Sequence, residues 1–434
     1  MTSARGFTVK LLVKMENSSA YSNLLLDDAL SRADLSEQDK RFASALFYGT
    51  LERRYTLDAV ITAHLKNSKD KLSIELKNIL RTGIYQLLYM DSVPDNSAVD
   101  ESVKLAKKLK NPALAGFVNG LLRSFIREGK QLPKSSSRVD ELSLEYSCPP
   151  WLTQKWMNEY GEKAALSMLS SSIGQAPVTV KANTLKMPVE DVIRLLEADG
   201  FTAEKSDIIK NALIVSGGGI EKSGAYRSGL IHVQDISCML CCEALAPCEG
   251  ETVLDICSAP GGKAFTSAEM MKNKGRLLAF DLHENRVRLI RSGAQRLGLS
   301  IIEARTNDGK LYDEGLPQAD RVLCDVPCSG LGVIRRKPEI KYKFPEEFSR
   351  LPAIQYEILS VSSRYVKAGG TLVYSTCTLS RAENDEVTDR FLREHPDFEQ
   401  GCLPEKLGPG SKVTITPDRF DSDGFFISVF KRKR

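Results

Sequence analysis

The last two hundred residues alternate between short apolar runs and amphipathic segments, and this alternation most constrains the fold. The clearest amphipathic segment, 287–297, has four apolar residues on one face and ends at Gly298. Alternation of this kind predicts a doubly wound α/β domain of Rossmann-like type with a largely parallel sheet. Two later runs, 413–416 and 424–430, predict a terminal antiparallel hairpin. The expected parallel strands are 252–256, 276–280, 301–304, 321–326 and 371–375.

The 434 residues are enough for more than one domain. Residues 1–140 show helical periodicity throughout and predict an all-α domain, with Asn96 or Ser97 capping one of its helices. Residues 141–232 predict a small α/β connector that begins after a Pro- and Ser-containing linker. We therefore expect three parts, with the doubly wound domain occupying 233–434.

The composition predicts a cytoplasmic protein without a membrane partner. No apolar stretch reaches membrane-spanning length, and the first residues lack the pattern of a secretory signal. The ten cysteines are expected to be free thiols in a reducing compartment.

The formal net charge is +4, and the basic excess lies in the helical part. The basic side chains of the segment 101–130 could bind a phosphate backbone, or they could form an ordinary solvated helix face. Its basic residues are Lys104, Lys107, Lys108, Lys110, Arg123, Arg127 and Lys130.

A glycine-rich turn follows the first expected strand directly. Its sequence, CSAPGGK, lets the backbone approach a ligand closely and directs the amides of the next helix toward it. The turn lacks the G-x-G-x-x-G spacing of dinucleotide-binding folds and the lysine-serine pair of nucleotide-binding P-loops. The seven residues of this candidate cofactor-binding turn are Cys257, Ser258, Ala259, Pro260, Gly261, Gly262 and Lys263.

Three aspartates stand at or just after successive strand ends. Asp281 ends the second strand, Asp308 follows the third, and Asp325 ends the fourth. A carboxylate about 20 residues beyond such a turn typically accepts the hydroxyls of a ribose. Together the turn and the aspartates predict a nucleoside-bearing cofactor without a polyphosphate, and S-adenosylmethionine fits this description.

Two cysteines, Cys328 and Cys377, follow the fourth and fifth expected strands in the sequences DVPCSG and YSTCT. Side chains at the carboxyl ends of parallel strands line the ligand crevice. Carbon 5 of cytosine is too weak a nucleophile to accept a methyl group directly. A thiolate that adds at carbon 6 activates carbon 5, and elimination of the cysteine later restores the ring. The pair therefore predicts covalent methyl transfer, with Asp325 as a candidate acid, although each cysteine alone could be a buried apolar residue.

A second group of cysteines, Cys238, Cys241, Cys242 and Cys248, contains a C-x-x-C spacing. This group favours packing in a helix over a metal site, because the four histidines of the chain form no cluster with it. We expect no metal. The basic run Arg335-Arg336-Lys337 is either an RNA contact or an ordinary solvated loop.

These motifs resemble one family. The segments 255–263 and 325–338, and 374–379 with the sequence ENDE at 383–386, are similar to the RNA 5-methylcytosine methyltransferases of the NOL1/NOP2/Sun type. The helical part resembles the NusB-like RNA-binding domain, through LRTGIYQLLY at 80–89 and FVNGLLR at 117–123. The combination is similar to the bacterial enzymes of this family that act on 16S rRNA.

The resemblance implies a class I methyltransferase that uses S-adenosylmethionine to methylate carbon 5 of a cytosine in 16S rRNA. It implies that Cys377 is the nucleophile and Cys328 the cysteine of release, and that Lys263 is close to the reacting centre. Asp281, Asp308 and Asp325 would line the cofactor site with the turn. Asn183 and the segment 233–235 match family signatures. Ala264 and Ser258 stand where the family often has threonine and alanine, and neither change removes a chemical group that the reaction needs.

Two other interpretations stay open at this stage, and a third is disfavoured. A tRNA cytosine-5 methyltransferase would carry the same catalytic motifs. A noncatalytic RNA-binding or antitermination factor would keep the NusB-like domain beside a degenerate catalytic domain. A thiol oxidoreductase would need a C-x-x-C pair at the site, and the only such pair lies in the expected packing helix, which argues against this interpretation. We expect RNA as the partner, without DNA, and a monomeric protein.

Overall fold

The computed structural model describes residues 3–18, 21–65, 67 and 71–434. Met1 and Thr2, which belong to the segment inspected for a signal, lie outside the described residues. The chain divides into two compact units. One contains residues 1–174 and 334–343, and the other contains residues 175–333 and 344–434. The domain boundaries expected after residues 140 and 232 stay predictions.

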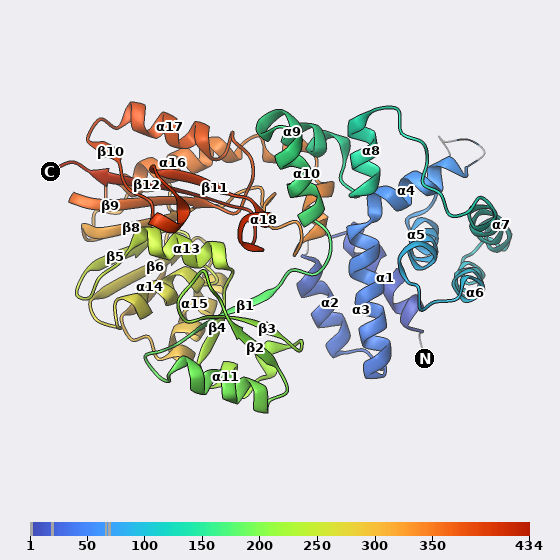
Figure 1. Cartoon of the computed structure of the whole chain (residues 1–434), viewed down its shortest axis with the longest axis horizontal. Helices are drawn as coiled ribbons and strands as arrows, with labels where there is room; N and C mark the ends of the chain where they lie inside the picture. Colours follow the sequence, from blue (N-terminus) through green and yellow to red (C-terminus); the bar gives the residue numbers. More distant parts are fainter. Residues whose placement is uncertain (1–2, 19–20, 66, 68–70) are drawn as a thin grey trace. The chain divides into compact units, whose positions relative to one another are not determined.

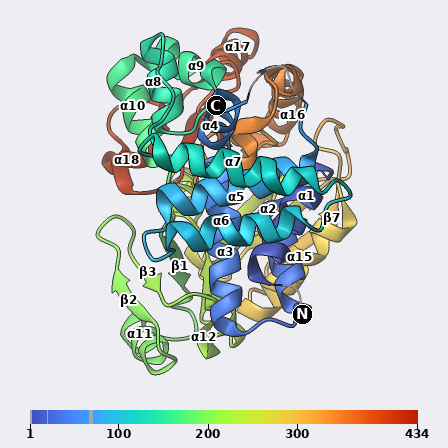
Figure 2. The ribbon, with the colours of Figure 1, turned by 90° about the vertical axis from the view of Figure 1, so that its right-hand side faces the viewer.

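The first unit is helical, as the periodicity predicts. Figure 2 shows α5, α6 and α7 side by side, and these helices share one hydrophobic core. Serine hydroxyls cap several helices; Ser73, for example, accepts a hydrogen bond from the amide of Leu76. The capping prediction at Asn96 or Ser97 is wrong, because that helix already begins at Asp95, after Pro94. The helices are α1 (Ala4–Glu16), α2 (Ser22–Ser31), α3 (Glu37–Glu52), α4 (Arg54–Ala63), α5 (Ile74–Tyr89), α6 (Asp95–Ala106), α7 (Ala113–Arg127), α8 (Arg138–Glu145), α9 (Pro150–Tyr160) and α10 (Glu162–Ser171).

A buried arginine joins three of these helices. Arg81 of α5 is 1% exposed, and its guanidinium donates to both carboxylate oxygens of Asp58 in α4, at 2.6 and 2.7 Å. The same group donates to Glu16 of α1 at 2.5 Å and to Asn78 at 3.1 Å. The planar guanidinium can satisfy two carboxylates at fixed angles, which an ammonium cannot do. Arg81 therefore sets the relative placement of α1, α4 and α5.

The segment 334–343 completes the helical unit from far along the chain. It contains a 3-10 helix, Pro338–Tyr342, whose Glu339 carboxylate accepts hydrogen bonds from the amide and the hydroxyl of Ser22 at 3.0 and 2.9 Å. The hydroxyl of Tyr342 donates to the carbonyl of Glu52 at 3.0 Å. The helical unit is therefore discontinuous in sequence.

The second unit begins with a small antiparallel sheet in the order β2-β3-β1-β4. The connector is therefore an α/β subdomain, as predicted. The amide of Asn183, directly after β1, donates to the carbonyl oxygens of Gly229 and Leu297 at 3.2 and 2.9 Å. Asn183 thereby ties this sheet to the helix that ends at Leu297. The elements are β1 (Val178–Ala182), α11 (Val189–Ala198), β2 (Thr202–Lys205), β3 (Ala212–Ser216), α12 (Gly224–Arg227) and β4 (Ile231–Val233).

The large sheet has the order β10-β12-β9-β8-β5-β6-β7, and β11 pairs with β12. The five strands from β7 to β9 are parallel, and β12 runs antiparallel to β9, β10 and β11. The predicted doubly wound fold with a terminal antiparallel hairpin is confirmed. Strands β8 and β9 begin earlier than expected. The strands are β5 (Thr252–Asp255), β6 (Arg276–Asp281), β7 (Ile302–Thr306), β8 (Ala319–Asp325), β9 (Val366–Thr376), β10 (Phe398–Gln400), β11 (Lys412–Ile415) and β12 (Phe425–Arg432).

Helices cover both faces of this sheet. Figure 1 shows α16 and α17 on one side and α13, α14 and α15 on the other. Alternate residues of each strand enter the two cores; in β6, Leu277 and Leu278 face opposite sides. Gly298, in the left-handed conformation at φ 74°, ends α15 as predicted. The helices are α13 (Ile236–Leu245), α14 (Gly262–Met270), α15 (Glu284–Leu297), α16 (Leu351–Ser363) and α17 (Asp385–Glu394).

None of the described helices combines the length and the apolarity needed to cross a lipid bilayer.

We predict that Arg81→Ala destabilises the helical unit by about 3 kcal/mol, because it leaves two carboxylates without their cation. Hydrogen–deuterium exchange of the full chain would show faster exchange in α1, α4 and α5. Arg123→Ala is the matched control, since Arg123 is exposed on α7 and its removal is expected to change stability by less than about 0.5 kcal/mol. Unchanged exchange in Arg81→Ala would contradict the assigned role.

Candidate functional site

The glycine-rich turn lies between β5 and α14, as predicted. Gly261 has φ 109°, and a Cβ added there would lie 2.5 Å from the ring of Phe265. Glycine is therefore required by both the backbone conformation and the packing. The first amides of α14 follow directly, and the amino end of a helix favours a negatively charged or polar ligand.

Asp255, the last residue of β5, is a buried carboxyl that lacks a hydrogen-bond partner among the described residues. It is 1% exposed, and neither oxygen is within hydrogen-bonding geometry of a donor. Burial raises the pKa of Asp255 to about 7; the nearby Ser258 hydroxyl offsets part of the shift, and the negative charge of Asp325 adds to it. An unpartnered polar group in this position is costly unless a ligand satisfies it.

Asp281 ends β6 and is 3% exposed. Its carboxylate accepts a hydrogen bond from the amide of His283 at 3.1 Å and pairs with the Arg286 guanidinium at 3.0 Å. Arg286 also donates to the carbonyl of Ala259 at 3.1 Å. Asp281 is therefore linked through Arg286 to the glycine-rich turn.

Asp308 lies on the loop after β7, where its carboxylate accepts a hydrogen bond from the amide of Lys310 at 3.0 Å. A Cβ added to the next residue, Gly309, would lie 3.9 Å from the sulfur of Cys257. The loop that carries Asp308 therefore packs against the glycine-rich turn. Burial raises the pKa of the Cys257 thiol well above its usual value, so this thiol is protonated.

Lys263 and Asp325 form an ion pair at the same edge of the sheet. The Lys263 ammonium donates to Asp325 at 2.7 Å, and the Ser375 hydroxyl donates to the other Asp325 oxygen at 2.7 Å. Burial lowers the pKa of Lys263, but the charge of Asp325, its hydrogen bond to Lys263 and the neighbouring Cys238 and Cys241 together outweigh this effect, and the net pKa lies well above the usual value. Lys263 is therefore an ammonium.

The two predicted cysteines meet. The sulfur atoms of Cys328 and Cys377 are 3.1 Å apart although the residues are 49 positions apart in sequence. Both side chains are partly exposed, and neither forms a disulfide. The hydrogen bond to Cys377 raises the pKa of Cys328 well above its usual value, and burial adds to the shift. Cys328 therefore keeps its proton and can donate it to the sulfur of Cys377.

Three of the four cysteines in the other group lie on one helix, as expected, whereas the prediction is wrong for Cys248, which is exposed and lies after the end of this helix. Cys238, Cys241 and Cys242 lie on α13, and burial raises the pKa of the Cys242 thiol to about 12. Among the residues with described positions, no group of three or more His, Cys, Asp or Glu side chains could hold a metal ion.

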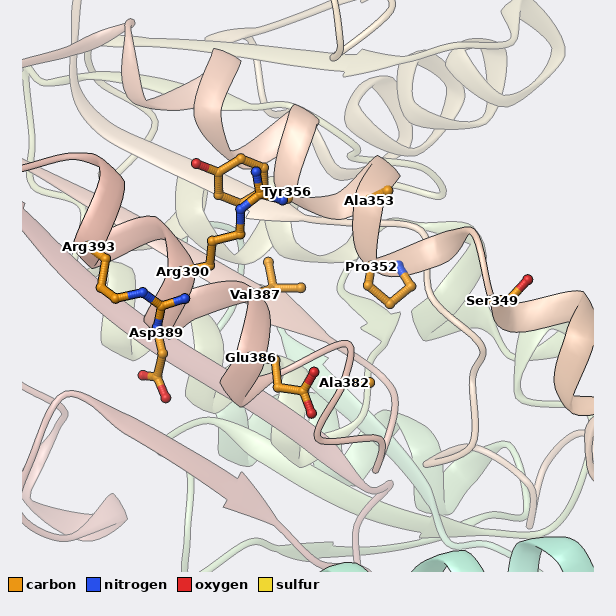
Figure 3. Close-up of a pocket in the computed structure, with 10 residues that line it drawn as sticks. All are labelled: Ser349, Pro352, Ala353, Tyr356, Ala382, Glu386, Val387, Asp389, Arg390 and Arg393. Carbon is orange, nitrogen blue, oxygen red and sulfur yellow. The ribbon is translucent and has the colours of Figure 1, made fainter.

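A separate hollow of about 550 Å³ lies between α16 and α17 (Figure 3). The guanidinium of Arg390 stacks on the Tyr356 ring at 3.7 Å from the ring centroid. Acidic Glu386 and Asp389 share the lining with Arg390 and Arg393, so the hollow has no dominant charge. Its lining contains none of the predicted site residues.

Three contributors to the site were not predicted from the sequence. Asp255 begins the segment 255–263 and ends strand β5, so the strand-end rule that identifies the other aspartates also applies to it. Ser375 holds Asp325. Glu383 accepts a hydrogen bond from the amide next to Cys328 at 2.9 Å. The last two lie far in sequence from their partners, and no local pattern indicates such contacts.

Three family models match successive parts of the chain. The model described as "16S rRNA methyltransferase RsmB/F" matches residues 242–431, that of the NusB family matches residues 2–127, and that of a ferredoxin-like domain of RsmF/B-like methyltransferases matches residues 148–219.

Curated relatives match the chain along nearly its whole length. A probable ribosomal RNA small subunit methyltransferase B of Bacillus subtilis is 40% identical and covers 100% of this chain and 99% of its own. The ribosomal RNA small subunit methyltransferase B of Proteus mirabilis is 33% identical over 92% of each chain.

Solved structures agree with these relatives. The crystal structure of PH0851 has a TM-score of 0.85 and 26% identity, and covers 100% of this chain and 99% of its own. A methyltransferase homolog protein from Pyrococcus horikoshii has a TM-score of 0.60 and 27% identity, and covers 69% of this chain and 100% of its own. The structure itself consists of a NusB-like helical unit, a ferredoxin-like connector and a Rossmann-like domain, which agrees with these matches. The chain therefore belongs to the 16S rRNA methyltransferase RsmB/F family.

Proposed function

We propose that this protein methylates carbon 5 of a cytosine in 16S rRNA through a covalent bond between Cys377 and carbon 6 of the base. The observation that carries the proposal is the 3.1 Å contact between the sulfur atoms of Cys377 and Cys328. The contact lies at the ends of two parallel strands, beside the Lys263–Asp325 ion pair. Membership of an rRNA methyltransferase family supports methyl transfer as the reaction class.

The cofactor in this proposal is S-adenosylmethionine. The unpartnered Asp255 carboxyl, the glycine-rich turn and the strand-end Asp281 fit a ligand with an amino group and a ribose. A protein of similar fold, whose sequence is 19% identical to this chain, was crystallised as "NSun6 from Pyrococcus horikoshii with SFG". When bound, S-adenosylmethionine supplies an electrophilic methyl group for carbon 5. Asp308 and residues 257–263 complete the proposed binding site.

The two cysteines act in a fixed order. Cys377, as thiolate, adds to carbon 6 while Cys328 remains a thiol. The main cause of the raised pKa of Cys328 is its hydrogen bond to Cys377. Once the Cys377 sulfur is bonded to carbon, this cause is removed, which lowers the pKa of Cys328 although burial still raises it. After Cys328 releases its proton to solvent, its thiolate can accept the proton from carbon 5. Breakage of the bond between sulfur and carbon 6 then returns Cys377 as thiolate and restores the aromatic ring.

The Lys263–Asp325 pair stabilises the activated base. Addition of a thiolate at carbon 6 places negative charge on the ring, and a positioned acid lowers the energy of that species. Lys263 holds the proton, and Asp325 fixes its position because Ser375 holds the second carboxylate oxygen. The acid function first attributed to Asp325 is therefore assigned to the pair.

The helical unit is proposed to dock on RNA. Lys107, Lys108 and Lys110 follow α6 and are exposed, whereas Lys104 is paired with Glu101. Exposed lysines of this kind bind phosphates by releasing counterions. The description of the matching family model and the small-subunit rRNA in the relatives' names favour 16S rRNA over tRNA as the target.

Bisulfite sequencing of rRNA and tRNA from cells with and without the gene tests the reaction and the target together. We expect one protected cytosine of 16S rRNA to lose its protection when the gene is deleted. Loss of protection in tRNA alone would favour the tRNA methyltransferase. Unchanged protection in both RNAs would contradict a cytosine-5 methyltransferase and favour a noncatalytic RNA-binding protein.

We predict that Cys377→Ala lowers methyl transfer by roughly 10⁴-fold or more, because it removes the nucleophile. Cys328→Ala is expected to form the bond to RNA but release it slowly, so that a protein–RNA adduct accumulates on denaturing gels. Cys402→Ala is the control, since Cys402 is an exposed cysteine outside the site. An active Cys377→Ala enzyme, or an adduct in Cys377→Ala rather than in Cys328→Ala, would overturn the assigned roles.

We predict that Asp255→Asn stabilises the protein at alkaline pH and weakens S-adenosylmethionine binding. Below the pKa of the unfolded state, about 3.8, the carboxyl is neutral in both the folded and the unfolded state and does not destabilise the fold. As the pH rises from there through the folded-state pKa of about 7, the free energy of unfolding falls, because the unfolded state ionises more easily than the buried carboxyl. The asparagine is neutral throughout, so its melting temperature should exceed that of the wild type more at pH 8.5 than at pH 6. Calorimetry would measure binding. An equal difference at both pH values would contradict the buried-carboxyl argument.

A further inference from the structure

The dipeptide Glu383-Asn384 lies at the turn before α17, and neither side chain has a part in the reaction proposed above. Glu383 is 2% exposed and Asn384 is fully buried. A buried carboxylate is costly unless several donors satisfy it. The donors to these two side chains come from the two loops that carry Cys328 and Cys377 and from Gln355 of α16.

Glu383 holds the Cys328 loop. Its carboxylate accepts hydrogen bonds from the amide of Ser329 at 2.9 Å and from the Ser329 hydroxyl at 2.6 Å. It also accepts from the Gln355 side-chain amide at 2.9 Å, and the same amide donates to the carbonyl of Pro327 at 3.0 Å. The residues on both sides of Cys328 are thereby fixed, one directly and one through Gln355.

Asn384 holds the Cys377 loop in the same way. The Thr376 hydroxyl donates to the side-chain oxygen of Asn384 at 2.6 Å, and the Asn384 amide donates to the carbonyl of Thr378 at 2.9 Å. The residues before and after Cys377 are therefore bonded to one side chain.

A direct bond joins the two loops. The hydroxyl groups of Ser329 and Thr378 are 2.6 Å apart. Because the Ser329 hydroxyl already donates its proton to the Glu383 carboxylate, the Thr378 hydroxyl is the donor of this bond. The charge on Glu383 thus sets the direction of a short chain of hydrogen bonds from the Cys377 loop, through the Cys328 loop, to the carboxylate.

We propose that Glu383 and Asn384 are positioning residues that hold the two thiols at their contact distance. The chemical value of this distance rests on the proposed function, but the distance itself does not. A nucleophile and its assisting group lose much of their effect when one is displaced by about 1 Å, which can cost about a hundredfold in rate.

The first measurement is independent of methyl transfer. Phenylarsine oxide bonds two neighbouring thiols with loss of one water, and peptide mass spectrometry locates the bridge. We expect bridging of Cys328 and Cys377 in the wild type and at least tenfold slower bridging in Glu383→Gln. The substitution replaces one hydrogen-bond-accepting oxygen with an NH₂ group, which cannot accept a hydrogen bond from Ser329. The matched control is Glu386→Gln, the same change at an exposed position three residues later, and it should bridge at the wild-type rate.

The second measurement is the rate of methyl transfer. We expect Glu383→Gln to lower kcat about a hundredfold while KM for the RNA and for S-adenosylmethionine changes less than threefold. Ser329→Ala removes the same contact from the other side, and it should lower kcat without adding to the effect of Glu383→Gln in the double variant. The single Ser329→Ala variant also provides the test if Glu383→Gln does not fold.

The outcomes separate the two proposals. Slower bridging with an enzyme that does not methylate cytosine would support the positioning role and reject the proposed function. Bridging and kcat both within twofold of the wild type in Glu383→Gln and in Ser329→Ala would overturn the positioning role and leave the proposed function intact. Additive effects in the double variant would also overturn it, since two members of one chain of bonds cannot act independently.

Discussion

The parallel pairing of β8 and β9 is the constraint on which the site depends. Asp325 is paired in register with Ser375, and the amide of Val326 donates to the Ser375 carbonyl at 3.1 Å. Parallel strands bring their carboxyl ends to one edge of a sheet, so side chains that are distant in sequence emerge together. The contact between the two thiols and the bond from Ser375 to Asp325 both follow from this register, and a shift of one residue would turn these side chains to the opposite face.

The fold of this domain could be predicted because its signals are local. Apolar runs and the glycine that ends α15 identify strands and a helix without reference to distant residues. The starts of β8 and β9 could not be predicted in this way. Strand β9 begins at Val366, and its first part contains Lys367, Gly369 and Gly370, which do not form an apolar run. The strand begins this early because Val366 pairs with Ala319, and the residues that follow it form an irregularity before the regular pairing resumes at Thr371 opposite Arg321, which is a tertiary effect.

The site could be predicted as far as the strand-end rule extends. This rule located Asp281, Asp325 and both cysteines, and the structure brings the cysteines into contact. The strand-end rule could not predict the protonation or the hydrogen-bond partners of these groups. Asp255 is unusual because of what surrounds it, and Glu383 contacts a residue 54 positions away. Side-chain networks of this kind depend on the complete tertiary structure. A motif can therefore indicate that residues lie in one site without indicating which of them are hydrogen-bonded to each other.

The discontinuity of the helical unit has a consequence for how the chain folds during synthesis. A ribosome releases residues 1–174 first, but the segment 334–343, whose Glu339 binds Ser22, belongs to the same compact unit. The helical unit therefore completes its contacts only after strands β1 to β8 have also been made. Until then the surface that binds this segment is uncovered, and a gene divided between residues 174 and 175 would encode two pieces that each lack part of a native interface.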